Sequence, residues 1–295
     1  MKSSAEKLSN DVSLMKKKRR PKDGAQQITI YACAILTVVI LFYLLVYIMV
    51  RGPPSVNWEF LSTAPSALNK TVGILPSIIN TLYMIGITLL IATPIGVGAA
   101  IFLNEYAKRG KIVKVIEFTT ETLAGIPSVL YGLFGAVFFG VTLQLGYSIL
   151  AGALTLVLMI LPIIVRTTQE ALKTVPNEYR EGALGIGTTK WHMIRTIILP
   201  GAIPGIITAV ILAIGRIVGE SAALLFTSGI GTNMPTNFFG HMMESGATLT
   251  VQLYTYAAKG QNDSAFGIAA VLVVIVLVIN LLTNYLSKRF SNKRQ

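Results

Sequence analysis

The chain has 295 residues, of which 53% are hydrophobic and only 13% are charged. Soluble domains carry about a quarter charged residues, so this composition excludes an ordinary soluble protein and indicates one that lies in a membrane. The net charge of +12 is compatible with an anionic partner, either nucleic acid or lipid head groups.

Uninterrupted apolar runs predict an all-α integral membrane protein. The runs 28–50 and 266–287 contain no charged residue, and each exceeds or matches the about 20 residues that cross the hydrocarbon core. The first run is longer than the apolar part of a cleaved signal peptide, which has about 7–15 residues, so we expect it to be retained. Six membrane helices are expected, at 28–50, 76–103, 115–140, 147–171, 201–227 and 265–287.

The remaining segments divide the chain around this membrane domain of residues 28–287. Residues 1–27 are polar and basic and are expected to form a disordered arm. Residues 228–264 form the longest loop on the outer side, and 247–257 within it are apolar enough for a short helix that dips toward the bundle. Residues 288–295 are a short basic tail.

The distribution of Lys and Arg predicts the orientation of the chain. Eight lie in the arm, four in 104–114, five in 166–200 and four in the tail, against three on the other side. Because positive charge stays on the cytoplasmic side, both termini are expected in the cytoplasm of a multi-pass cell-membrane protein. The charge is thus explained by topology and by contact with anionic lipids, and no nucleic-acid partner is expected.

Residue patterns for catalysis by this chain alone are missing. Gly110-Lys111 is followed by Ile112, where a nucleotide-binding loop has Ser or Thr. His192 and His241 are far apart in the sequence and the single cysteine has no partner. We therefore expect no catalytic residue, no metal site and no cofactor, and energy for any transport must come from a partner or an ion gradient.

Two features of the second and third predicted helices leave alternatives open. Pro94 and Pro127 lie among small residues, which suits either close helix packing or a hinge beside a pathway. Glu117 and Glu121 begin the third predicted helix near Lys114. Either they are interfacial charges, paired with that lysine or with lipid-facing waters, or they take a direct part in transport.

The stretch 170–200 has the features of a docking element. It is long for a loop between two membrane helices and mixes charged with helix-forming residues. A short helix is predicted after Pro176, with Asn177 as its N-cap, and "GIG" at 185–187 ends it. From these residues alone, the stretch is either a crosswise helix that docks on a partner or a solvated loop.

A specific motif lies within this stretch. From Glu181 the sequence reads Glu-Gly-Ala, three residues, Gly187, nine residues and then Ile-x-Leu-Pro ending at Pro200. This resembles the EAA loop of ABC-importer permeases, with Gly182 in place of the first Ala. The resemblance implies a type I importer (MetI-like) bundle whose coupling helix docks in a groove of the ATPase subunit. It assigns ATPase coupling to Glu181, Gly182, Ala183 and Gly187.

The wider sequence is similar to one branch of that family, the permeases of the high-affinity phosphate importer. The similar segments include "LAGIPSVLYGLFG" (123–135) and "GRIVGESAALLFTSG" (215–229). "ESAALLFTSG" resembles the A-type (PstA) pattern, although Ala223 replaces the family's proline. The resemblance implies a non-enzymatic subunit that forms half of a phosphate path. Its implied partners are a second permease, two ATP-binding subunits, an extracytoplasmic phosphate-binding protein and membrane lipids.

Arg216 and Glu220 are the candidate translocation residues. Arg216 is about 24 Å along the predicted helix from Pro200, near mid-membrane, where a bare Arg costs at least about 2.5–3.5 kcal/mol. A spacing of four residues would place Glu220 on the same face as its ion-pair partner. A guanidinium fits two phosphate oxygens at once, and the resemblance implies a role in phosphate passage.

Three other functions remain open from these residues. The first is a permease for sulfate, molybdate or phosphonate. The second is an ion-driven secondary carrier, and the third is a scaffold whose Arg216–Glu220 pair only joins subunits.

Overall fold

The computed structural model describes residues 21–66, 71–108 and 110–292, and it divides the chain into two units at Val50 and Arg51. Most of the predicted disordered arm (1–20) and the end of the tail (293–295) lie outside the described residues. The described part of the first unit is one helix, α2 (Pro21–Arg51), which begins seven residues before the expected position.

The second unit is built from helices and short helical turns. The turns η3, η4 and η5 are π-helical and extend or precede longer helices. The elements in chain order are η2 (Pro53–Ser55), α3 (Trp58–Ser62), α4 (Leu75–Ile101), η3 (Phe102–Tyr106), α5 (Lys111–Ala124), α6 (Ser128–Gly135), η4 (Ala136–Thr142), α7 (Ile149–Lys173), α8 (Asn177–Gly185), α9 (Lys190–Met193), η5 (Ile194–Ile198), α10 (Leu199–Gly219), α11 (Ala222–Thr227), α12 (Phe238–Met242), α13 (Leu249–Ala258) and α14 (Asn262–Asn292).

Within the described residues, five helices are long and apolar enough to cross a membrane, and a bent pair brings the number to six. The bent pair replaces the straight third helix expected at 115–140: α5 and the α6–η4 segment meet at 99°. Pro127 lies at the bend. It cannot donate a backbone hydrogen bond and it disfavours helical geometry in the preceding residue, so the bend is much sharper than the gentle kink the sequence suggested.

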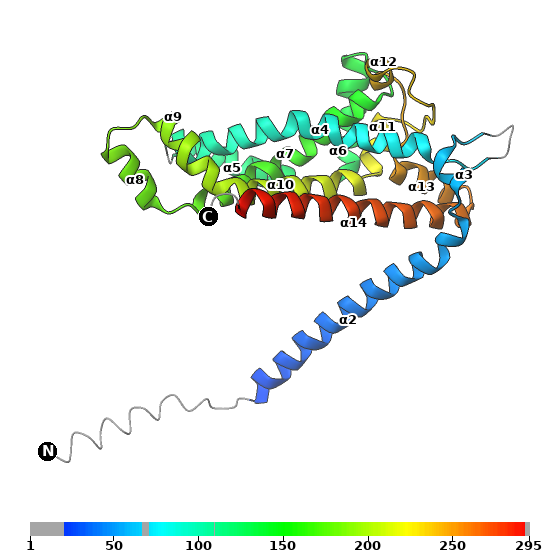
Figure 1. Ribbon diagram of the computed structural model, residues 1–295, viewed down its shortest axis with the longest axis horizontal. Helices are drawn as coiled ribbons and strands as arrows, with labels where there is room; N and C mark the ends of the chain where they lie inside the picture. Colours follow the sequence, from blue (N-terminus) through cyan, green and yellow to red (C-terminus); the bar gives the residue numbers. More distant parts are fainter. Residues whose placement is uncertain (1–20, 67–70, 109, 293–295) are drawn as a thin grey trace. The chain divides into compact units, whose positions relative to one another are not determined.

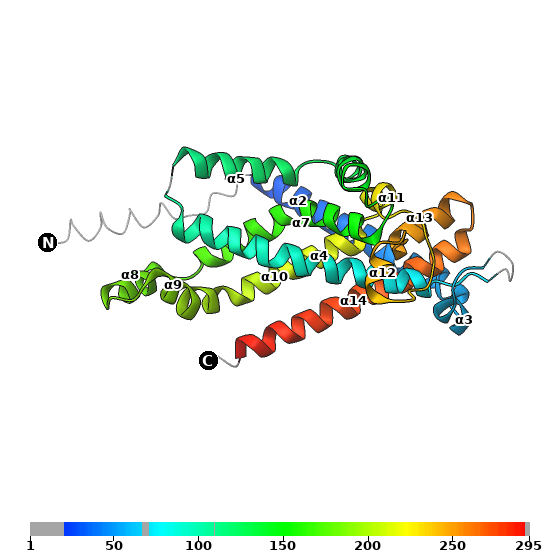
Figure 2. The same cartoon turned by 90° about the horizontal axis from the view of Figure 1, so that it is seen from above.

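The helices α4, α7, α10 and α14 run lengthwise beside one another (Figures 1 and 2). Helix α7 is their centre, because 67% of its most apolar window is buried, against 28% in α4 and 17% in α14. Both views place α8 and α9 at one end, the α8 end, and α3, α12 and α13 at the other, the α13 end.

Close packing against neighbouring helices accounts for glycines in α4 and α6. A Cβ atom at Gly135 would lie 2.1 Å from the hydroxyl oxygen of Thr155, and one at Gly132 would lie 2.8 Å from the Cα of Ala223. A Cβ at Gly96 would lie 2.6 Å from Ile164. Packing against α7 and α11 therefore explains these small residues without a hinge.

A buried polar cluster fixes α12 against α4 at the α13 end. His241 is fully buried. Its Nδ1 lies 2.9 Å from the Glu244 carboxylate and its Nε2 lies 2.7 Å from Oδ1 of Asn80. The Asn80 amide nitrogen donates in turn to the carbonyl of Ala247. The long loop between α11 and α14 is therefore anchored to the bundle by side-chain hydrogen bonds.

We expect His241→Ala to lower the free energy of unfolding by about 2–3 kcal/mol, because Asn80 then keeps a buried oxygen without a donor. Thermal unfolding of the purified protein in detergent measures the effect. His192→Ala is the matched control, since His192 is exposed on α9 and its loss should shift the midpoint little. Equal shifts for both variants would contradict the anchoring role.

Candidate functional site

The candidate site lies where α10 breaks. Helix α10 ends at Gly219, Glu220 has extended backbone angles (φ −83°, ψ 127°), and α11 begins at Ala222. The continuous helix expected over 201–227 is therefore wrong. Glycine at the last position has low helix propensity, and with alanine at 223 instead of the family's proline, the chain still breaks at this point.

The Glu220 side chain is buried, with 6% of its surface exposed, and it holds the break together. Its Oε1 accepts a hydrogen bond from the backbone N–H of Ala223 (3.0 Å). Its backbone carbonyl accepts one from the hydroxyl of Thr250 (2.8 Å). One residue thus connects the end of α10 with the first turns of α11 and α13.

Arg216 lies in the last turn of α10 with 47% of its side chain exposed. Its Nη2 is 3.9 Å from Oε2 of Glu220 and 3.9 Å from the sulfur of Met159. Both contacts are longer than normal hydrogen bonds. Within the described part of the chain, no oxygen atom forms a hydrogen bond to this guanidinium, so its N–H donors remain available to a ligand.

A contact with Met159 places the Arg216 guanidinium beside α7, with about half of the side chain exposed on the surface of this chain. Met159 is at the eleventh of 25 positions in α7, so the guanidinium lies near the mid-length of the central helix. Tyr131 of α6, whose hydroxyl donates a hydrogen bond to the carbonyl of Leu123, packs in the same apolar core as Met159 and Ile217, the residue after Arg216. The site therefore lies next to the core that α6, α7 and α10 share.

Substitutions of Glu220 separate its capping role from its charge. Glu220→Gln keeps an oxygen acceptor for the Ala223 N–H, whereas Glu220→Ala leaves that buried donor unpaired. We expect Ala to lower the free energy of unfolding by about 1–3 kcal/mol and Gln to lower it much less. Thermal unfolding of both variants in detergent checks this, and equal destabilisation by both would contradict the capping role.

The acidic pair of α5 has a different partner from the expected Lys114. Oε1 of Glu121 lies 2.8 Å from Nη1 of Arg166 on α7. Both side chains are 64% exposed and line an open cavity of about 360 Å³, together with Glu117. Of the alternatives that the sequence left open, Lys114 is not the partner of Glu121, because α5 packs on α7 and brings Arg166 to it from 45 residues away in the sequence.

Helix α8 occupies the segment expected to couple to an ATPase. Glu181 and Gly182 are exposed, whereas Ala183 is 5% exposed and packs into the core at the α8 end. Asn177 is the first helical residue and makes no capping hydrogen bond, so its predicted N-cap role is wrong.

Gly187 terminates α8 through its left-handed backbone, with φ of +82°. The N–H of Gly187 donates to the carbonyl of Leu184, and the N–H of Thr188 donates to that of Ala183. This is the hydrogen-bond pattern of a Schellman motif, whose left-handed position favours glycine. The motif therefore has a physical reason for glycine at this position.

Comparison with known proteins gives the family of this fold. Residues 92–294 match the family model of the binding-protein-dependent transport system inner membrane component. The chain belongs to this family. A probable ABC transporter permease protein of Bacillus subtilis, YqgI, is 37% identical over 278 residues, which cover 88% of this chain and 93% of the relative. The phosphate transport system permease protein PstA of Haemophilus influenzae is 34% identical over 86% of this chain and 89% of its own length.

A solved structure in the same fold is a bacterial alginate ABC transporter in complex with a pentasaccharide-bound periplasmic protein. It aligns with a TM-score of 0.66 at 18% identity and covers 92% of this chain and 98% of the matched chain. The expected all-α permease bundle is confirmed, and the chain is a multi-pass membrane protein.

Several residues that complete the site were missed by sequence reasoning. Thr250 and Met159 are uncharged and lie in apolar runs, so no local pattern identifies them. Arg166 follows directly on an apolar run at the end of the fourth predicted helix. Its charge was the available signal, and only the packing of α5 on α7 reveals its partner.

Proposed function

We propose that the chain is a membrane-spanning permease subunit of an ATP-driven importer of inorganic phosphate. The observation that carries the proposal is the sequence similarity to PstA over most of both chains. The half-exposed guanidinium of Arg216, near the mid-length of α7, supports it, because a planar cationic fork suits a tetrahedral oxyanion.

Arg216 and Glu220 form the translocation site in this proposal. Glu220 is held in place by Ala223 and Thr250, so its carboxylate stays near the cation without binding it closely. A nearby negative charge weakens the hold of Arg216 on an anion. Weak binding favours passage, since transport requires release as well as capture.

The orientation follows from the positive residues. Lys and Arg gather in the sequence up to the start of α2, around α5, around α8 and from the last turns of α14 onward, so the α8 end faces the cytoplasm and the α13 end faces outward. An extracytoplasmic phosphate-binding protein then delivers its ligand at the α13 end, and two ATP-binding subunits act on α8. A second permease completes the path, and ATP hydrolysis belongs to the ATP-binding subunits.

Four residues of the α8 segment carry the coupling to ATP in this proposal. Glu181 and Gly182 face solvent where a partner can reach them, Ala183 packs α8 on the bundle, and Gly187 sets the direction in which the chain leaves α8. ATP-driven movement of α8 then rocks the bundle between outward-open and inward-open states.

Uptake of labelled phosphate by the complex in proteoliposomes tests the function. We expect uptake to require ATP, the ATP-binding subunits and the binding protein, and excess sulfate, molybdate or methylphosphonate to compete poorly. If one of these anions competed as strongly as unlabelled phosphate, the assignment of phosphate as the substrate would be wrong. Uptake driven by an ion gradient without the ATP-binding subunits would reject the proposal.

A further inference from the structure

Helix α8 has little backbone connection to the helices that it must move. It has nine residues, and only Ala183 among them is buried. Non-helical residues 174–176 precede it and residues 186–189 follow it. A short helix between two such linkers can rotate freely unless side chains fix it to the bundle.

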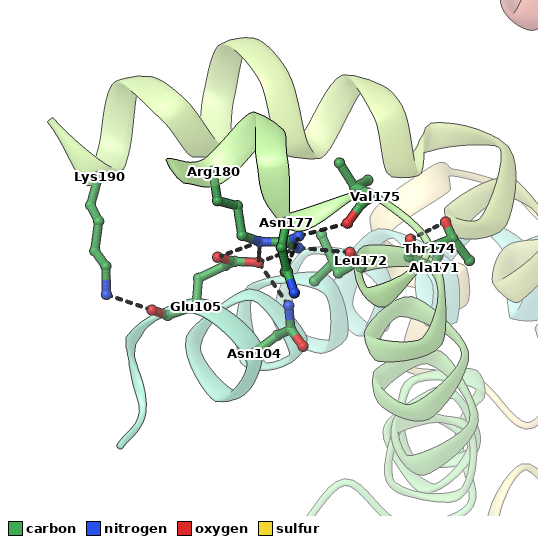
Figure 3. Close-up of polar contacts among 9 residues, drawn as sticks. All are labelled: Asn104, Glu105, Ala171, Leu172, Thr174, Val175, Asn177, Arg180 and Lys190. Atoms are coloured by element: carbon green, nitrogen blue, oxygen red, sulfur yellow. Dashed lines mark hydrogen bonds and ion pairs between the residues drawn. The ribbon is translucent and has the colours of Figure 1, made fainter. Parts of the chain in front are cut away.

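One side chain of α8 makes that connection (Figure 3). The guanidinium of Arg180 donates from Nε and Nη2 to the carboxylate of Glu105, at 3.2 and 2.9 Å. It also donates to the carbonyls of Leu172 (2.8 Å) and Val175 (2.6 Å) and to Oδ1 of Asn177 (3.2 Å). These bonds occupy all five N–H donors of an arginine, which a lysine could not do.

Glu105 accepts hydrogen bonds from α8 on one side and from α9 on the other. It lies in η3, the extension of α4, and its side chain is only 5% exposed. Besides the two bonds from Arg180, the carboxylate accepts a hydrogen bond from Asn104 (2.7 Å), and the Glu105 backbone carbonyl accepts one from Lys190 (2.8 Å). Lys190 begins the segment that continues through η5 into α10. The residue therefore connects α4, α8 and α10.

Burial makes the Arg180–Glu105 ion pair costly to separate. An exposed pair such as Lys173–Glu170, with both side chains more than half exposed, can separate into water at little cost. Arg180 and Glu105 are 15% and 5% exposed, so separating them leaves an uncompensated buried charge. Arg180 therefore links α8 to η3 and to the end of α7 through buried hydrogen bonds.

We propose that Arg180 and Glu105 are positioning residues that form a latch, the Arg180–Glu105 latch, through which α8 moves α4, α7 and α10 together. The proposal rests on the proposed function, because it assigns the latch to the transfer of work from an ATPase at α8. The latch lies inside the permease, whereas Glu181 and Gly182 are the surface residues that a partner can reach.

Two measurements test the latch in Arg180→Lys, in Glu105→Gln and in the double variant, with Lys173→Gln as the exposed-pair control. The first is phosphate imported per ATP hydrolysed by the complex in proteoliposomes. The second is the distance distribution between spin labels at Tyr179→Cys on α8 and Phe102→Cys on η3. It is recorded on the full chain in nanodiscs in a Cys33→Ser background, because Tyr179, Phe102 and Cys33 are exposed.

We expect the latch variants to broaden the distance distribution and to import at least about tenfold less phosphate per ATP, the factor that loss of a charge-assisted hydrogen bond corresponds to. The double variant should be no worse than the worse single variant, since both remove one connection. Lys173→Gln should change neither readout.

A narrow, wild-type distance distribution in the latch variants overturns the proposal, whether or not import falls. A broadened distribution with unchanged import per ATP also overturns it, because α8 would then be mobile without consequence for coupling. Failure of the proposed function gives a different result: the wild-type complex itself does not import phosphate with ATP, while the spin labels still report on the latch in the chain alone.

Discussion

Arg216→Gln should lower phosphate uptake by at least about a hundredfold in a complex that still assembles. Two charge-assisted hydrogen bonds from the fork to an oxyanion contribute about 1.5–3 kcal/mol each, and glutamine can replace neither the charge nor the paired geometry. Because no oxygen atom of the described chain forms a hydrogen bond to this guanidinium, the fold should tolerate its removal. Labelled-phosphate uptake in proteoliposomes is the measurement.

Two further substitutions sharpen this experiment. Arg216→Lys keeps the charge without the fork and should retain a partial activity. Arg195→Gln is the matched control, because Arg195 belongs to the same continuous helical segment, Lys190–Gly219, and is exposed near its start. Full uptake by an assembled Arg216→Gln complex would show that the pair with Glu220 only joins subunits.

Replacing Glu181 and Gly187 together should separate ATP hydrolysis from phosphate uptake. A side chain at Gly187 must adopt φ of +82° or move the end of α8, and the left-handed conformation costs an alanine about 1–2 kcal/mol. Combined with the loss of the exposed carboxylate of Glu181, we expect import per ATP to fall roughly thirtyfold, from an equilibrium shift of about 2 kcal/mol. Parallel assays of ATP hydrolysis and uptake by the reconstituted complex measure the ratio.

The control for this variant lies in the same helix. Gly185 and Gly187 both have open space where a Cβ would be, but of these two only Gly187 has a left-handed backbone. Gly185 is the last residue of α8 and has no part in the proposed coupling, so Gly185→Ala should leave coupling intact. Normal uptake in the double variant, with the ATP-binding subunits still bound, would contradict the coupling role of the segment.

The long helices could be predicted because their evidence is local. The apolar runs behind α4, α7 and α14 carry their own signal of length and hydropathy, and the structure confirms them. The break at Glu220 carries no such signal, since glycine, glutamate and serine all occur inside helices. What ends α10 is the set of hydrogen bonds that Glu220 makes to Ala223 and Thr250.

The partners of ion pairs are also beyond what the sequence alone can predict. The sequence offers Glu121 a lysine seven residues away as one possible partner, but its partner is Arg166, 45 residues away. Arg180 and Glu105 are 75 residues apart, and each looks like an ordinary surface charge in the sequence. The charges themselves are visible in the sequence, but their pairing depends on which helices pack together.

The π-helical turns η3 and η5 allow the helices at the α8 end to change length along their axes. A π turn holds more residues than an α turn, and converting it to α geometry lengthens or shortens the regular helix by about 1.5 Å for each residue exchanged. Glu105 lies within η3, and η5 begins four residues after Lys190. Conversion between the two geometries would therefore change the length of α4 and α10 beside α8 and α9 with no loss of backbone continuity.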